Sequence, residues 1–227
     1  MMKKIIITIM FLIVALLNIH AQNKLDVYVA GNYGLYKVKV SDVYSSAISS
    51  KFSGGIGAHI SYKLTPNLRV VALPVVQQRG YMSSNIHHIY DVSVGYIDVP
   101  IGVEYDFNIH LFVKSLNLGE KDEKVFFLGA GLYEGFAING KYTDKLYNTP
   151  PEKIKFGESL TDNRSSTDFG LNFNVGLRIR SFKIGLQKQL GLKNVVPSAR
   201  QAKDGSLKTT GFGMFVAYKI SNLKKKK

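Results

Sequence analysis

The sequence predicts an all-β fold: an eight-stranded antiparallel up-and-down transmembrane β-barrel, preceded by a cleaved signal peptide. Two observations predict the barrel. Segments of about ten residues alternate apolar and polar side chains, as membrane-spanning strands do, and the polar positions are rich in glycine and charge. A third observation, a short apolar run behind two lysines at the N-terminus, predicts export of the chain.

The alternation is clearest in residues 168–192. Strict period-2 alternation over about twelve residues indicates a strand and not a helix. After a reversal at residues 180–182 the pattern resumes, so the segment is expected to be a hairpin. One face of its first strand is continuously apolar, with Phe169, Leu171, Phe173, Val175, Leu177 and Ile179. The other face is polar, with Asn172, Asn174, Arg178 and Arg180. This pattern predicts an apolar exterior and a polar interior.

The remaining strands are located by the same alternation. They are expected at residues 25–36, 54–64, 68–78, 97–108, 125–138 and 211–220. Pro74 predicts a bulge or break in the third, because proline cannot donate to a strand ladder. Short periplasmic turns are expected at 65–67 and 180–182, with a longer periplasmic link at 109–123. The outer loops are expected at 37–53, 79–91, 139–167 and 193–208, which matches the asymmetry of bacterial outer-membrane barrels.

The N-terminus resembles a secretory signal. Lys3 and Lys4 precede an apolar run at 5–17, which is shorter than the about 20 residues that a membrane-spanning helix needs. Cleavage is predicted after Ala21. The domain organisation is therefore a signal peptide at 1–21, a barrel at 22–223 and a basic tail at 224–227. The expected location is the outer membrane of a Gram-negative cell.

The composition excludes several classes of site. The chain has no cysteine, so disulfides, thiolate metal sites and a lipid-modified cysteine are excluded. Its formal charge is +14, but the basic residues are not clustered with stacking aromatics as nucleic-acid binding requires. We therefore expect no nucleic acid partner, and interpret the charge as suited to an anionic lipid surface.

Charged residues at polar positions of the strands predict a network inside the lumen. Its predicted members are three acids and four bases: Asp98, Glu104, Asp106, Arg178, Arg180, Lys183 and Lys219. Eight strands enclose an interior just wide enough for side chains to fill, and unpaired charge there is costly. Acids on one wall are therefore expected to pair with bases on the other. The alternative is a charged conduction path.

Two other groups of residues could form sites. His87 and His88, with Asp91 as a possible third ligand, could begin a metal site, but adjacent histidines on an extended segment point to opposite sides. Ser83 and Ser84 beside these histidines could form a rim hydrolase, but the chain has no Gly-x-Ser-x-Gly motif. The sequence therefore favours solvated loop residues, no metal, no cofactor and no catalytic residue.

Several segments resemble the PorT-like family of outer-membrane β-barrel proteins. They are YIDVPIGVEY at 96–105, FFLGAGLYEGF at 126–136, DFGLNFNVGL at 168–177, IGLQKQLGL at 184–192 and the closing FVAYKI. The resemblance implies an eight-stranded barrel in a Gram-negative outer membrane. It also implies the barrel assembly machinery and type IX secretion-system proteins as partners.

The expected function is that of a non-enzymatic integral outer-membrane protein with a mostly filled lumen, which acts as a structural or interaction protein through its outer loops. A narrow pore or small-ligand-binding barrel is the alternative, followed by an outer-membrane lipid-modifying enzyme. A soluble lipocalin-like barrel also has eight antiparallel strands, but its apolar face would point inward. The direction in which the apolar positions face decides between these folds.

Overall fold

The computed structural model describes residues 25–41, 47–84, 87–108 and 124–220. Within these residues it contains ten strands and two short helices. The strands are β1 (Leu25–Ser41), β2 (Ala47–Lys63), β3 (Leu68–Ala72), β4 (Val75–Ser84), β5 (Ile89–Asn108), β6 (Lys124–Asp144), β7 (Glu152–Lys153), β8 (Thr167–Ile179), β9 (Phe182–Gly191) and β10 (Ser206–Lys219). The helices are η3 (Ser198–Arg200) and α3 (Gln201–Asp204). The predicted signal peptide, the 109–123 link and the 224–227 tail lie outside the described residues.

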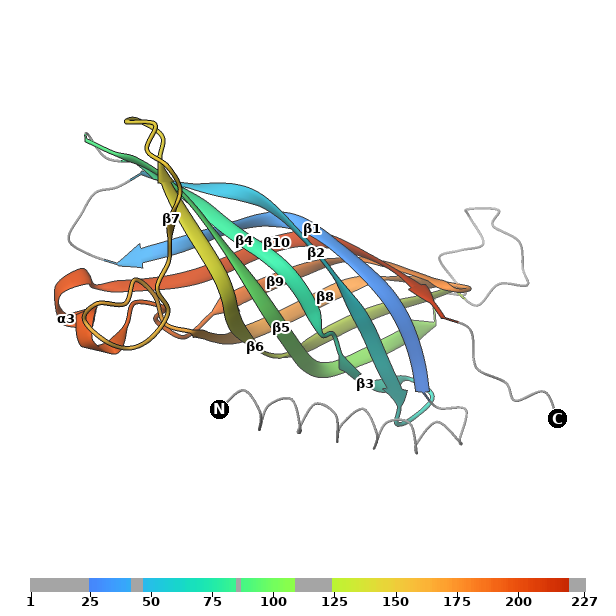
Figure 1. Ribbon diagram of the computed structural model, residues 1–227. Coiled ribbons are helices and arrows are strands. Elements are labelled where there is room, and N and C mark those ends of the chain that lie inside the picture. Colours follow the sequence, from blue (N-terminus) through green and yellow to red (C-terminus); the bar gives the residue numbers. More distant parts are fainter. Residues whose placement is uncertain (1–24, 42–46, 85–86, 109–123, 221–227) are drawn as a thin grey trace.

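The sheet closes into a ring of eight antiparallel strands, as the sequence predicts (Figure 1). β1 pairs with β2 on one side and with β10 on the other. β3 and β4 together form one wall position, because both pair with β2 and with β5. The break between them falls at Leu73 and Pro74, where the interruption was predicted. β7 pairs only with the outer end of β6 and is not part of the ring.

The strand register fixes the tilt of the barrel. The register can be followed around the ring by passing from each residue to its cross-strand partner on the next strand. Starting at Leu35 of β1, the successive partners are Phe212, Lys188, Phe173, Ala130, Val103, Val70, Tyr62 and finally Leu25, again on β1. The circuit returns to β1 ten residues from its start, since 35 − 25 = 10. A shear of this size over eight strands corresponds to a strand tilt of about 40°. Each residue along a strand therefore rises by about 2.5 Å along the barrel axis.

The apolar side chains point outward and the polar side chains point inward. On β5, Ile101 and Val103 are half exposed, whereas Asp98 and Glu104 are fully buried. The outward apolar positions of β5 run from Ile97 to Phe107, a height of about 25 Å, which is the height of the apolar band of membrane barrels. The lower edge of this belt is aromatic: Tyr105, Phe107, Phe126, Phe182 and Tyr218. This arrangement is the reverse of a lipocalin-like interior.

Several strands extend further at the outer end than predicted, so the predicted bounds of the outer loops were wrong. The expected loop at 37–53 is largely strand, because β1 continues to Ser41 and β2 begins at Ala47. The loop expected at 79–91 is shortened by the same kind of extension of β4 and β5. The extensions of β2, β4 and β5 pair with one another as neighbouring strands of the wall. Their outward side chains meet water rather than lipid, so the apolar alternation that marks the belt is lost while the strands continue.

The outer end of the molecule has a small core of its own. At Gly95 and Tyr96 the register between β5 and β6 shifts, which turns the strand extensions away from the ring. Val92, Val94, Tyr96 and Ile154 form a buried cluster there. The segment 139–167, which includes the end of β6 and the short strand β7, is therefore folded at the outer end of the barrel. The segment 193–208 contains η3 and α3 and lies at the same end (Figure 1). None of the helices in the described part of the chain has the length and apolar character that crossing a membrane requires.

Candidate functional site: the charged lumen

The lumen holds two groups of charged side chains, one near each end of the apolar belt. Strand alternation positions them, because every second residue of β5, β8 and β9 points inward. The ladder pair Arg178 and Lys183 flanks the β8–β9 turn, so both side chains lie near the lower end. We name the group around Glu104 and Asp106 the base cluster, and the group around Arg79 the mouth cluster.

Glu104 and Lys183 form the centre of the base cluster. The Lys183 Nζ lies 2.6 Å from both carboxylate oxygens of Glu104, and both side chains are fully buried. The Asn174 amide donates to Glu104 Oε1 at 2.9 Å. Lys183 Nζ also lies 2.8 Å from His59 Nε2 and 4.1 Å from the centre of the Phe127 ring. A fully buried lysine and glutamate are tolerated only when they are paired in this way.

A chain of ion pairs continues from the base cluster toward the lower opening. Asp106 accepts from Arg178 Nη1 at 2.9 Å and from Arg69 Nε at 2.8 Å. Arg69 Nη1 also donates to Asp26 at 2.8 Å, and Lys219 Nζ lies 2.5 Å from the same carboxylate. The chain joins β8, β5, β3, β1 and β10, so it connects strands on opposite walls of the ring.

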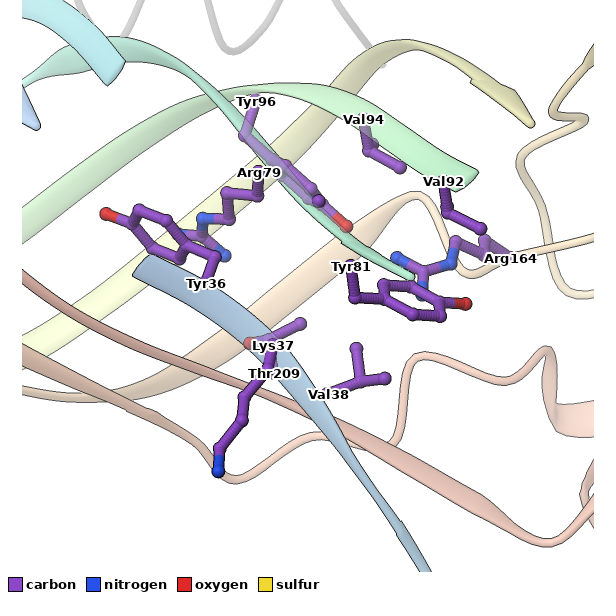
Figure 2. A pocket seen from close by; sticks show the side chains of 11 residues that line it. Tyr36, Lys37, Val38, Arg79, Tyr81, Val92, Val94, Tyr96, Arg164 and Thr209 are labelled. Atoms are coloured by element: carbon purple, nitrogen blue, oxygen red, sulfur yellow. The ribbon is translucent and has the colours of Figure 1, made fainter. Parts of the chain in front are cut away.

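The mouth cluster is organised around Arg79 of β4. Its guanidinium bonds to Asp98 of β5 through Nη2 and to Asp168 of β8 through Nη1, the latter at 2.6 Å. Thr209 donates to Asp168 at 2.6 Å, and Tyr133 donates to it at 3.1 Å. Figure 2 shows Arg79 beside the rings of Tyr36 and Tyr96, whose centres lie 5.8 and 4.6 Å from the guanidinium carbon.

Arg164 closes the mouth from the segment before β8. Its side chain is buried and lies beside Tyr81, with its guanidinium carbon 5.1 Å from the ring centre (Figure 2). Arg79 and Arg164 line one cavity with Tyr81, Tyr96 and Thr209. The free space in this cavity is about 10 Å³, which is at the lower limit for one water molecule. The outer mouth is therefore filled by side chains of the chain itself.

Six of the seven residues of the predicted lumen network point into the barrel, five of them in the base cluster and the ion pairs below it, and Asp98 in the mouth cluster. Asp106 and Arg178 pair with each other, and so do Glu104 and Lys183. Asp98 pairs with Arg79 and Lys219 pairs with Asp26, so these two predicted members have partners that the prediction did not include.

The placement of Arg180 in the lumen was wrong. This residue is exposed at the β8–β9 turn and has a φ of 51°. Its left-handed backbone reverses the chain, so the alternation that points Arg178 inward does not extend to it.

Six charged or polar residues of the lumen were not among the predicted site residues, for three different reasons. Arg69 lies on the predicted strand at 68–78, whose apolar residues occupy both parities, and Arg79 falls in the predicted loop at 79–91. Asp26, His59 and Asp168 stand at polar positions of predicted strands, so their parity could have identified them. Arg164 lies in an irregular segment, where no periodicity indicates its direction.

The lumen is also filled by large uncharged side chains. Tyr28, Tyr96, Tyr133 and Phe127 point inward and are almost completely buried. They lie between and around the charged groups, since Tyr133 reaches Asp168 and Phe127 covers Lys183. The interior thus combines paired charges with packed aromatic rings.

The histidine pair lies outside the lumen at the outer end. His88 Nδ1 lies 2.5 Å from Asp144 Oδ2, and its ring stacks on Tyr90 at 5.2 Å between centres. Ser84 donates to the carbonyl oxygen of Ala47 across the β2–β4 ladder. Among the residues that the structure describes, no three histidine, aspartate or glutamate side chains are grouped to hold a metal ion.

Comparisons with known proteins give structural similarity only. No protein-family model matches the chain, and no curated protein matches it in sequence. The resemblance to the PorT-like family therefore stays a prediction. Similar solved structures include neisserial surface protein A, with 14% identity over 85% of this chain and 96% of that chain at a TM-score of 0.43. They also include Ail of Yersinia pestis in complex with the heparin analogue sucrose octasulfate, with 15% identity over 86% and 99% and a TM-score of 0.38. The outer membrane protein AlkL has 11% identity over 85% and 87% and a TM-score of 0.34.

Proposed function

We propose that this protein is a non-enzymatic integral outer-membrane barrel that acts as a structural or interaction protein through its outer loops. The observation that carries the proposal is the combination of an outward apolar belt about 25 Å high with a lumen filled by ion pairs and aromatic rings. The belt suits lipid. The filled lumen leaves the outer surface as the part of the molecule that meets other molecules.

The ion-pair network favours a plug over a pore. A conducting lumen needs polar groups that face water, whereas Glu104, Lys183 and His59 are fully buried and bond to one another. Tyr133 and Arg79 fill the section above them, and Arg164 closes the mouth. A conduction path would require several of these contacts to break together.

Two measurements on the refolded protein test this proposal. The chain should migrate faster unheated than boiled in detergent electrophoresis, and it should insert into planar bilayers without conducting ions. A variant in which Tyr133, Phe127 and Lys183 are all replaced by alanine or serine supplies the positive control for conductance. Solubility without detergent would refute the membrane location, and steady conductance of the wild type would refute the plug.

The proposed partners are the barrel assembly machinery during insertion and proteins of the type IX secretion system afterwards, which rests on the family resemblance. The folded segment 139–167 and the helices η3 and α3 provide a structured outer surface for such contacts. Because the chain has no cysteine, a single cysteine introduced at exposed Leu160 gives site-specific cross-linking in whole cells. Cross-linked products that contain no secretion protein, together with normal secretion after deletion of the gene, would rule out that link.

A further inference from the structure

Three lysines lie outside the barrel, immediately above the apolar belt on β1 and β10. Lys37, Lys39 and Lys208 are exposed and occupy the outward parity of their strands. Directly below them, Leu35 and Phe212 form the last outward apolar ladder pair on these two strands. With a rise of about 2.5 Å per residue, the three lysines stand roughly 5 to 10 Å above that pair. We name them the rim lysines.

The register places two of these charges face to face. Lys39 is the ladder partner of Lys208, and Lys37 lies diagonally across from Lys208 as the partner of Thr210. Like charges opposite each other on a sheet destabilise the pair. The outward positions that flank them, Leu35, Thr210, Phe212 and Leu190, carry no acid.

Several other lysines of the barrel are paired with acids. Lys51 and Lys145 share Asp91 at the outer end, and Lys219 pairs with Asp26 at the lower end. Within the part of the chain that the structure describes, no ion pair joins an acid to any of the rim lysines. Among these residues nothing neutralises the rim lysines, so an anion at the height where the apolar belt ends can bind to them.

We propose that the rim lysines bind an anionic, phosphate-bearing lipid headgroup in the leaflet at the outer end of the barrel. This inference rests on the proposed membrane location. Acyl chains would pack on Leu35, Phe212 and the belt below, while a phosphate would sit between Lys39 and Lys208 and relieve their repulsion. Lys188 adds a further positive charge on the same side of the barrel. It points outward between Leu186 and Leu190, from where its side chain can extend upward to the level of the headgroup.

Native mass spectrometry of the refolded full chain tests the proposal. The probes are phosphatidic acid and phosphatidylcholine with the same acyl chains, added to zwitterionic micelles. The patch variant is Lys37→Gln/Lys39→Gln/Lys208→Gln. The control variant is Lys141→Gln/Lys153→Gln/Lys203→Gln, which removes the same charge from exposed lysines elsewhere at the outer end. Each lysine near an anionic lipid surface contributes about fivefold to binding, so the patch variant should lose affinity for phosphatidic acid by about a hundredfold.

The outcomes separate this inference from the proposed membrane location. Loss of heat modifiability in the wild type would refute both. A heat-modifiable wild type that binds the two lipids equally, or a control variant that loses as much affinity as the patch variant, would refute the lipid site alone. Displacement of phosphatidic acid by excess inorganic phosphate would assign the site to free phosphate and overturn the lipid assignment. Selective retention in the wild type and control, resistant to phosphate, supports it.

Discussion

The base and mouth clusters of the lumen are built from the same residue types, but their hydrogen bonding differs. In the base cluster, Glu104 receives Lys183 and Asn174, and both oxygens of Asp106 accept bonds from Arg178. In the mouth cluster, one oxygen each of Asp98 and Asp168 has no partner. Three hydrogen-bond donors in this region also lack a partner in the protein: Arg79 Nε, Arg164 Nη2 and the Tyr96 hydroxyl.

This difference indicates different roles for the two ends. Buried polar atoms without protein partners are the places where ordered water binds, and the mouth cavity lies among such atoms. The base cluster has one such atom, Arg178 Nε, and is covered by Phe127. We infer that the base is the dry, rigid part of the plug and that the mouth is partly hydrated.

The largest expected effect on the free energy of unfolding comes from breaking the Glu104–Lys183 ion pair at the centre of the base cluster. Lys183→Met leaves the buried Glu104 carboxylate with only a longer ion pair, to Arg178 Nη2 at 3.8 Å, which should lower the free energy of unfolding by about 3–5 kcal/mol. Because the chain has no tryptophan, urea unfolding in micelles is followed by far-ultraviolet circular dichroism. The double variant Lys183→Met/Glu104→Leu removes both charges and should recover most of the loss. A single variant as stable as the wild type would show that water reaches the base.

A smaller loss is expected from the equivalent change in the mouth cluster. Arg79→Met removes the shared partner of Asp98 and Asp168, but nearby water can solvate their free oxygens. We expect a loss of about 1–3 kcal/mol in the same unfolding measurement. Arg79→Lys, which keeps the charge and loses the fork of donors, is the matched control and should lose less. A loss equal to that of Lys183→Met would mean that the two ends are equally dry, and would remove the distinction between them.

The same contrast explains which parts of the molecule the sequence predicts well. The belt and the base cluster are encoded in strict alternation, because lipid outside and a crowded lumen inside constrain both faces of every strand. Glu104, Asp106, Arg178 and Lys183 could therefore be placed from parity alone. At the mouth the outer faces meet water, the alternation weakens, and β4 and β5 extend unseen, so Arg79 was assigned to a loop. Arg164 is set by tertiary packing on Tyr81, which no local pattern records.

The smallest effect on stability is expected at the outer surface above the mouth cluster, where solvent screens the charges. Glu158 accepts from the Ser165 hydroxyl at 2.5 Å and from the Ser198 backbone N–H at 2.8 Å. These bonds lower the pKa of the Glu158 carboxyl below its usual 4.5. Because the folded pKa is the lower one, this stabilisation is present above pH 4.5 and is lost as the pH falls through the lowered pKa.

Hydrogen exchange of the Ser198 amide, corrected for the intrinsic rate, measures this tie between the segment before β8 and helix η3. Protection should fall in that acidic window, while amides beside Glu104 keep theirs. Glu158→Gln keeps the side-chain size but cannot gain a proton there, so its protection should be lower at neutral pH and independent of pH across the window. Equal pH dependence in the wild type and in Glu158→Gln would assign the effect to another group. Loss confined to Ser198 would show that the outer surface can loosen while the plug beneath it stays intact.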